Sequence, residues 1–225
     1  MYTKSLTSLI ASVAMSAVAL GVSAQESRAD HAPTHDWTGP YIGAIFGIGS
    51  VNAEFELPSS GSGSGSFDAL SDYGFMGGLV VGWNAQDGHM VYGIVGDVSF
   101  GEVDATENIF GVDLTVNTDL FATIRGRVGV AANDILLYGT AGLAILDGDV
   151  SSANGGASPG FTALGGVVGA GAELALSQDV SFKAELLYAF FDEDVDLGGV
   201  NGFFPGETVN IEEFYTVRFG INWHF

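Results

Sequence analysis

The residues that could carry out acid–base, nucleophilic or metal chemistry are few in this 225-residue chain, and they are scattered. Histidine occurs at positions 31, 35, 89 and 224, and no cysteine is present, which excludes thiol catalysis, thiolate zinc sites and disulfides. No histidine lies where a serine or aspartate partner and an external substrate could meet it. The motifs H-E-x-x-H and G-x-G-x-x-G do not occur. We therefore expect a protein that is not an enzyme and that has no resident cofactor.

The N-terminus has the pattern of a secretion signal. Lys4 precedes an apolar, small-residue stretch over 6–22, and the sequence that follows favours cleavage after Ala24. We expect residues 1–24 to be a signal peptide. Residues 25–36 are polar and have little to bury, so we expect a flexible periplasmic tail.

Two pairs in this tail, Asp30-His31 and His35-Asp36, combine imidazole with carboxylate. Transition metals accept both ligand types, but two histidines on an unstructured segment are usually solvated. A metal site in the tail is therefore the weaker interpretation.

Acidic residues dominate the charge, with 27 Asp and Glu against 6 Lys and Arg and a formal net charge of -21. This balance excludes a nucleic-acid partner, because phosphate backbones are bound by clustered Lys and Arg. Asp192, Asp194 and Asp196 have the spacing that opens a calcium loop, but the glycine that such a loop requires is displaced to Gly198. These aspartates are weak metal candidates. Loosely bound divalent cations or a diffuse solvated acidic surface both fit the crowded carboxylates.

From Trp37 onward, apolar residues recur at every second position, which is the period of a β-strand. The clearest stretch is 215–225, where one face is apolar and the other collects small and polar residues. No apolar run after the N-terminus reaches the roughly 20 residues of a spanning helix, so a membrane could be crossed only by strands. Seven more stretches alternate in the same way: 41–52, 74–84, 90–100, 120–130, 135–145, 162–176 and 180–191.

The connections between these stretches alternate in length. Outer-membrane barrels have short periplasmic turns and long extracellular loops, whereas four long structureless loops would be unusual in a soluble domain. The sequence therefore predicts an all-β, eight-stranded, antiparallel up-and-down transmembrane barrel over 37–225. The tight turns are 84–89, 131–134 and 177–179, and the expected long loops are 53–73, 101–119, 146–161 and 192–210.

The polar face distinguishes this barrel from a soluble one. A soluble barrel would carry many charged side chains on its outer face, but here the polar face is mostly Gly, Thr, Ser and Asn. Aromatic residues near strand ends lie on the apolar face, as in the girdles of membrane barrels. Because an unpaired buried charge is costly, we predict that the few charges of the polar face form a network inside a narrow lumen. Its members are Asp97, Arg125, Arg127, Glu173, Lys183, Glu185 and Arg218.

Six segments, in this order, cover most of the chain outside the loops: 37–43, 77–84, 123–129, 169–173, 183–188 and 216–225. Together they resemble the small outer-membrane barrels of alphaproteobacteria, the porin-like or outer-membrane immunogenic proteins. The resemblance implies a barrel in the bacterial outer membrane, in contact with its lipids. It also implies that Phe225 is an assembly signal read by the barrel-assembly machinery, and it implies no catalysis. The loops depart from the family in having no Lys or Arg, which argues against salt bridges to lipopolysaccharide phosphates.

Three functions fit these expectations: a structural, surface-exposed envelope protein with long acidic extracellular loops, a small-solute porin, and a loop-mediated adhesin or receptor. Glycines on the polar face favour a pore, but charged side chains share that face, and eight-stranded barrels are usually filled by side chains. We favour the filled barrel and expect a monomer.

Overall fold

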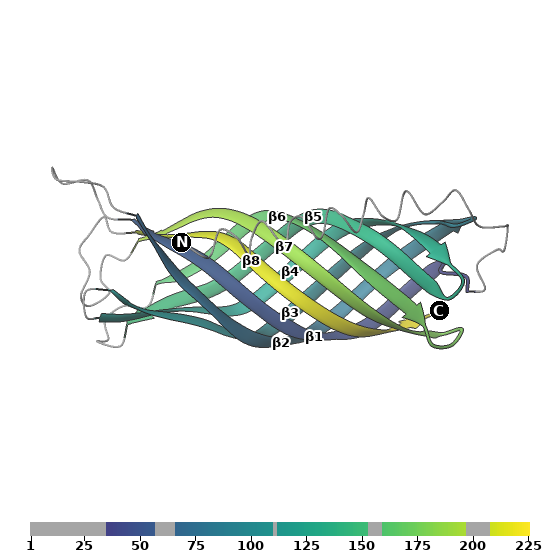
Figure 1. Ribbon diagram of the computed structural model, residues 1–225, viewed down its shortest axis with the longest axis horizontal. Coiled ribbons are helices and arrows are strands. Elements are labelled where there is room, and N and C mark those ends of the chain that lie inside the picture. Colours follow the sequence, from purple (N-terminus) through teal and green to yellow (C-terminus); the bar gives the residue numbers. More distant parts are fainter. Residues whose placement is uncertain (1–34, 57–65, 110–111, 153–158, 197–207) are drawn as a thin grey trace.

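The computed structural model describes residues 35–56, 66–109, 112–152, 159–196 and 208–225. Its eight strands close one antiparallel barrel, in which consecutive strands are neighbours and the last strand pairs with the first (Figure 1). The predicted eight-stranded up-and-down barrel is confirmed. Among the described residues, no helix is long and apolar enough to cross a membrane. The strands are β1 (Gly39–Glu56), β2 (Ser66–Asp87), β3 (Met90–Ile109), β4 (Val112–Ala132), β5 (Ile135–Ser152), β6 (Gly160–Ala175), β7 (Val180–Asp196) and β8 (Thr208–His224).

Three tight turns lie at the end of the barrel that also holds the C-terminus (Figure 1). Gly88 (φ 60°) and Asn133 (φ 54°) provide the left-handed backbone that the two-residue turns β2–β3 and β4–β5 require. In the β6–β7 turn, the Ser177 hydroxyl accepts a hydrogen bond from the backbone N–H of Val180 at 3.1 Å. These turns fall where the sequence predicts them.

The opposite end differs from the sequence prediction, because paired strands extend far into the segments expected to be loops. β3 and β4, for example, stay paired as far as Ile109 and Val112. A paired ladder satisfies backbone N–H and C=O groups without needing an apolar face. A prediction from alternating apolar and polar side chains therefore makes these strands too short.

The register shifts explain where the sequence signal ends. β3 has an extra residue between Phe100 and Val103, and β7 has one between Phe190 and Glu193. Opposite Asn52 and Ala53 of β1, the extra residue lies in the partner strands β2 and β8. A bulge adds a residue to one strand and exchanges the faces to which the following side chains point. The alternating pattern therefore stops at a bulge although the strand continues.

The outer face of the barrel is apolar, whereas the outer face of a soluble barrel is polar. Phe75 is 80% exposed, Leu164 68% and Ile124 66%, and each projects away from the lumen. Exposed apolar surface on this scale marks contact with lipid. The soluble-barrel alternative is therefore excluded.

Candidate functional site

Two arginines and two carboxylates form a closed set in the middle of the lumen. Arg125 lies 2.6 Å from Asp97 and 2.9 Å from Glu185. Arg218 contacts the same carboxylates, at 2.7 Å in each case. All four side chains are buried. Each guanidinium is thus shared between two carboxylates, and the four residues join β3, β4, β7 and β8 across the barrel.

Neutral hydroxyl groups add further hydrogen bonds to this set. Thr123 donates to Asp97 at 2.7 Å and accepts from Arg125 Nε at 2.8 Å, and the Tyr138 hydroxyl donates to Glu185 at 3.1 Å. Lys183 Nζ lies farther away, 3.9 Å from Glu185 Oε2. Buried charges are stabilised only when their remaining donors and acceptors are also satisfied. These contacts satisfy most polar atoms at the centre of the lumen, although Arg218 Nε has no partner among the described residues.

Glu173 organises a second group, nearer the end of the barrel that has the tight turns. Its carboxylate accepts hydrogen bonds from Arg127 at 2.9 Å, from Ser181 at 2.6 Å and from Asn222 at 2.6 Å. His224 Nε2 lies 3.5 Å from Glu173 and 2.9 Å from the Ser181 hydroxyl. The fully buried carboxylate of Glu173 in β6 therefore has partners from three other strands, β4, β7 and β8.

Aromatic rings fill the space between the two groups. The Arg127 guanidinium lies 4.3 Å from the centre of the Tyr138 ring and 5.6 Å from that of Tyr41. A Cβ atom at Gly82 would overlap the Tyr41 ring, and one at Gly171 would overlap the Tyr138 ring. These lumen glycines therefore make room for rings, not for a water channel.

The structure brings all seven predicted lumen residues inside the barrel and gives each an oppositely charged partner. Sequence reasoning missed their neutral partners, which lie on the same polar faces of the strands but carry no charge to draw attention. A search of those faces for hydroxyl, amide and aromatic side chains would have found them. They are Tyr41, Thr123, Tyr138, Thr140, Ser181 and Asn222.

The N-terminal expectations are described only in part. Residues 1–34, which include the predicted signal peptide and Asp30-His31, lie outside the described residues, so the cleavage after Ala24 stays a prediction. His35 was expected to be solvated in a tail that ends at Asp36. Instead it is buried, because it packs edge-on against Trp37 with ring centroids 4.5 Å apart. His35, which belongs to the predicted tail, therefore packs against the barrel.

The metal candidates remain weak. Asp192, Asp194 and Asp196 lie at the end of β7, and their side chains are outside the part that the structure describes. Within that part, no group of three or more His, Asp or Glu side chains is placed to hold a metal ion. The lumen is therefore the one built site among the described residues, and its chemistry is ion pairing.

A closed barrel with an apolar outside and an ionic inside defines a bacterial outer-membrane barrel protein. Residues 11–225 match the outer membrane protein beta-barrel domain, and the chain belongs to this family. The protein is located in the outer membrane.

Named relatives come from alphaproteobacteria, as the sequence resemblance indicated. The chain is 32% identical over 187 residues to the 22 kDa outer membrane protein of Rhizobium leguminosarum bv. viciae, covering 80% of this chain and 77% of the relative. It is 32% identical over 244 residues to the 31 kDa outer-membrane immunogenic protein of Brucella melitensis biotype 1, covering 98% of both. Neither name is that of an enzyme.

A solved structure supports the fold. The outer membrane protein OprG from Pseudomonas aeruginosa superimposes with a TM-score of 0.55 at 14% identity, covering 86% of this chain and all of that chain. At this identity the likeness shows the barrel fold alone.

The topology can be tested by protease treatment of intact cells. Proteinase K is expected to cut only within 53–73, 101–119, 146–161 and 192–210, because membrane barrels keep their tight turns on the periplasmic side. Trypsin is the matched control, since these four segments contain no Lys or Arg. Cleavage by proteinase K at 84–89 or 131–134 in intact cells would reverse the topology.

Proposed function

We propose that this protein is a non-enzymatic, structural component of the outer membrane whose closed barrel carries long, acidic, surface-exposed segments. The observation that supports this most directly is the filled lumen. Charged side chains from β3, β4, β6, β7 and β8 meet across it, and rings from β1 and β5 occupy the remaining space.

The same observation argues against the small-solute porin. A solute crossing the lumen would have to separate the pairs that Arg125 and Arg218 make with Asp97 and Glu185. Separating a buried pair leaves each charge without compensation, which costs several kcal/mol in proteins, on the order of 3 to 5. An eight-stranded barrel also has no room for a second path beside the network.

Charge is divided sharply between the lumen and the outer surface. Every Lys and Arg after residue 28 is a member of the lumen network. On the outer face, carboxylates near the extracellular end are held by neutral donors instead: Asp147 by Thr162, Asp149 by Asn117, and Glu213 by Tyr188 and Tyr215. A rim of this kind repels the anionic lipid surface, so we propose that loosely bound divalent cations serve as its counterions.

The contacts of the protein follow from this arrangement. We propose that its partners are outer-membrane lipids along the apolar face and the barrel-assembly machinery at the C-terminal strand, and that the barrel acts as a monomer. An adhesin or receptor role would depend on the tips of the long segments, whose residues lie outside the described part.

Single-channel recording in planar bilayers tests the proposed function. The refolded protein is expected to give no discrete conductance steps at neutral pH, because the ion pairs close the lumen. A general porin refolded in the same detergent is the positive control, and migration in unheated gels shows that the barrel is folded. Reproducible conductance from folded barrels would favour the small-solute porin instead.

A further inference from the structure

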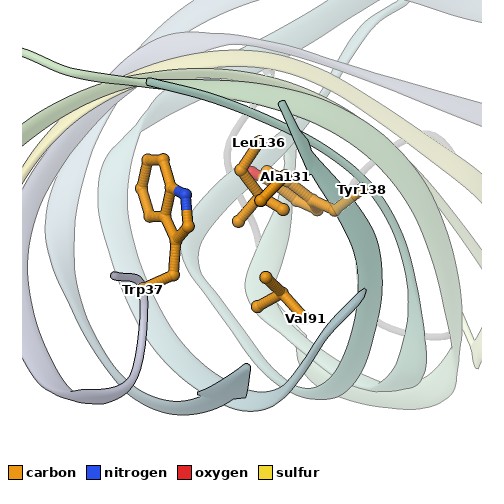
Figure 2. Close-up of a cluster of buried hydrophobic side chains, with 5 residues drawn as sticks. All are labelled: Trp37, Val91, Ala131, Leu136 and Tyr138. Carbon is orange, nitrogen blue, oxygen red and sulfur yellow. The ribbon is translucent and has the colours of Figure 1, made fainter. Parts of the chain in front are cut away.

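The residues just before β1 do not leave the barrel but turn back into its periplasmic mouth. We call His35–Thr38 the latch. The Trp37 side chain is completely buried inside the barrel, where it belongs to an apolar cluster (Figure 2). The other members come from three strands that line the mouth: Val91 of β3, Ala131 of β4, and Leu136 and Tyr138 of β5. Trp37 therefore plugs the mouth beneath the ionic lumen.

Gly39 is the hinge between the latch and β1. Its φ of +131° lies in a region that side chains rarely adopt, and a Cβ atom there would lie 2.7 Å from the carbonyl oxygen of Phe225. Glycine is the residue that permits such a turn close to another backbone segment. The inward course of the latch thus depends on this position.

Few polar contacts fasten the latch. The backbone N–H of Trp37 donates to the side-chain oxygen of Gln86 at 2.8 Å, and the backbone N–H of Gln86 donates to the Thr38 hydroxyl at 3.2 Å. Asp36 accepts from the Thr38 N–H at 2.9 Å, a bond that lowers the pKa of Asp36. These bonds lie at the exposed or half-buried edge of the mouth, so the latch is held mainly by the burial of Trp37.

Several buried polar atoms around the plug have no hydrogen-bond partner among the described residues. They are His35 Nε2, Trp37 Nε1, and both side-chain amide atoms of Asn84. A buried donor or acceptor that lacks a partner destabilises the state in which it is buried. The closed position therefore combines a well-packed ring with polar groups that have no partner among the described residues.

His35 lies where a proton can reach it. A cavity of about 190 Å³ at the mouth is lined by His35, Asp134 and the β6–β7 turn. The His35 ring lies 4.5 Å from the Trp37 ring and 5.8 Å from the His224 ring, between centroids. Burial and the neighbouring His224 lower the pKa of His35, although Asp134, Asp36 and Glu173 act in the opposite direction.

We propose that the latch is an acid-sensitive plug of the periplasmic mouth, closed when His35 is neutral and released when His35 is protonated. Protonation of the His35 imidazole places a positive charge in a buried site that faces His224. This buried charge destabilises the closed state. A histidine whose pKa is lowered in the closed state stabilises that state at pH values above its ordinary pKa of about 6.5. This stabilisation is lost as the pH falls below that value. Release exposes Trp37 and wets the mouth, while the ionic network still closes the lumen.

Fluorescence of Trp37 tests this proposal in the full-length refolded barrel. The double variant Trp83→Phe/Trp223→Phe leaves Trp37 as the single tryptophan. We expect Trp37 to resist quenching by acrylamide at pH 7.5 and to lose this protection on acidification, with a midpoint below about 6.5. Circular dichroism and gel migration at each pH show whether the barrel stays folded. Constant protection from pH 8 to pH 4.5, or stronger protection in acid, would overturn the proposal.

Two variants assign the effect to the latch. His35→Asn in the single-tryptophan background should keep Trp37 protected at every pH, whereas His89→Asn, in the β2–β3 turn at the same end, should leave the transition unchanged. Gly39→Ala should expose Trp37 even at pH 7.5, because the added Cβ would clash with the backbone of Phe225 and strain the hinge. A transition that survives His35→Asn would assign the titration to another residue and overturn the role of His35.

Discussion

Replacing Glu185 with alanine is expected to destabilise the barrel by about 3 to 5 kcal/mol, more than any other single lumen substitution. Glu185 is the carboxylate on which Arg125, Arg218 and Lys183 converge, and it also accepts from Tyr138. Its removal leaves three buried cations with only Asp97 as a nearby anion in the central set. Removing one partner of a buried ion pair leaves the other charge uncompensated, and this lowers the stability by more than the intact pair contributes to it.

Urea titration of the refolded protein in detergent measures this loss, with folded and unfolded forms separated by gel migration. Glu213→Ala is the matched control, because Glu213 lies on the outer face and its carboxylate accepts from two neutral tyrosine hydroxyls. That control is expected to change the unfolding free energy by about 1 kcal/mol. A similarly small effect of Glu185→Ala would mean that the lumen is hydrated and would favour the porin.

Deleting Phe225 is expected to reduce strongly the amount of protein that reaches the outer membrane while changing the stability of the refolded barrel only modestly. The ring projects outward and is 74% exposed, and the Phe225 N–H donates to the Pro40 carbonyl at 3.1 Å. Loss of one lipid-facing ring costs about 1.5 to 3 kcal/mol. A severe assembly defect would therefore come from loss of the terminal signal that we propose for the assembly machinery.

Quantitative immunoblots of outer-membrane fractions, compared with urea titration of the same variant, separate assembly from stability. Phe75→Ala is the matched control, since Phe75 is another outward-facing ring but lies far from the C-terminus. It should lose a similar amount of apolar contact yet insert normally. Equal outer-membrane levels of the Phe225 deletion and the native chain would remove any special role for the terminal residue.

Sequence alone determined the number of strands, the tight turns and the face to which each membrane-level residue points. A period of two is a local property, because successive side chains of a strand point to opposite sides whatever the strand pairs with. Parity therefore placed Arg125, Glu185 and Arg218 on the inner face before their partners were known. The same reasoning failed beyond Phe100 and Phe190, where bulges exchange the faces of strands that continue.

Only the tertiary structure decided which charges meet and how the barrel is closed. Arg218 and Asp97 are 121 positions apart, and their pairing depends on barrel closure and on the register of every intervening strand. The latch has no periodic signal, since it consists of four residues outside the first strand. Its course is set by the positive φ of Gly39 and by the space that Trp37 finds among residues of three strands. Such contacts join residues distant along the chain, so local pattern cannot specify them.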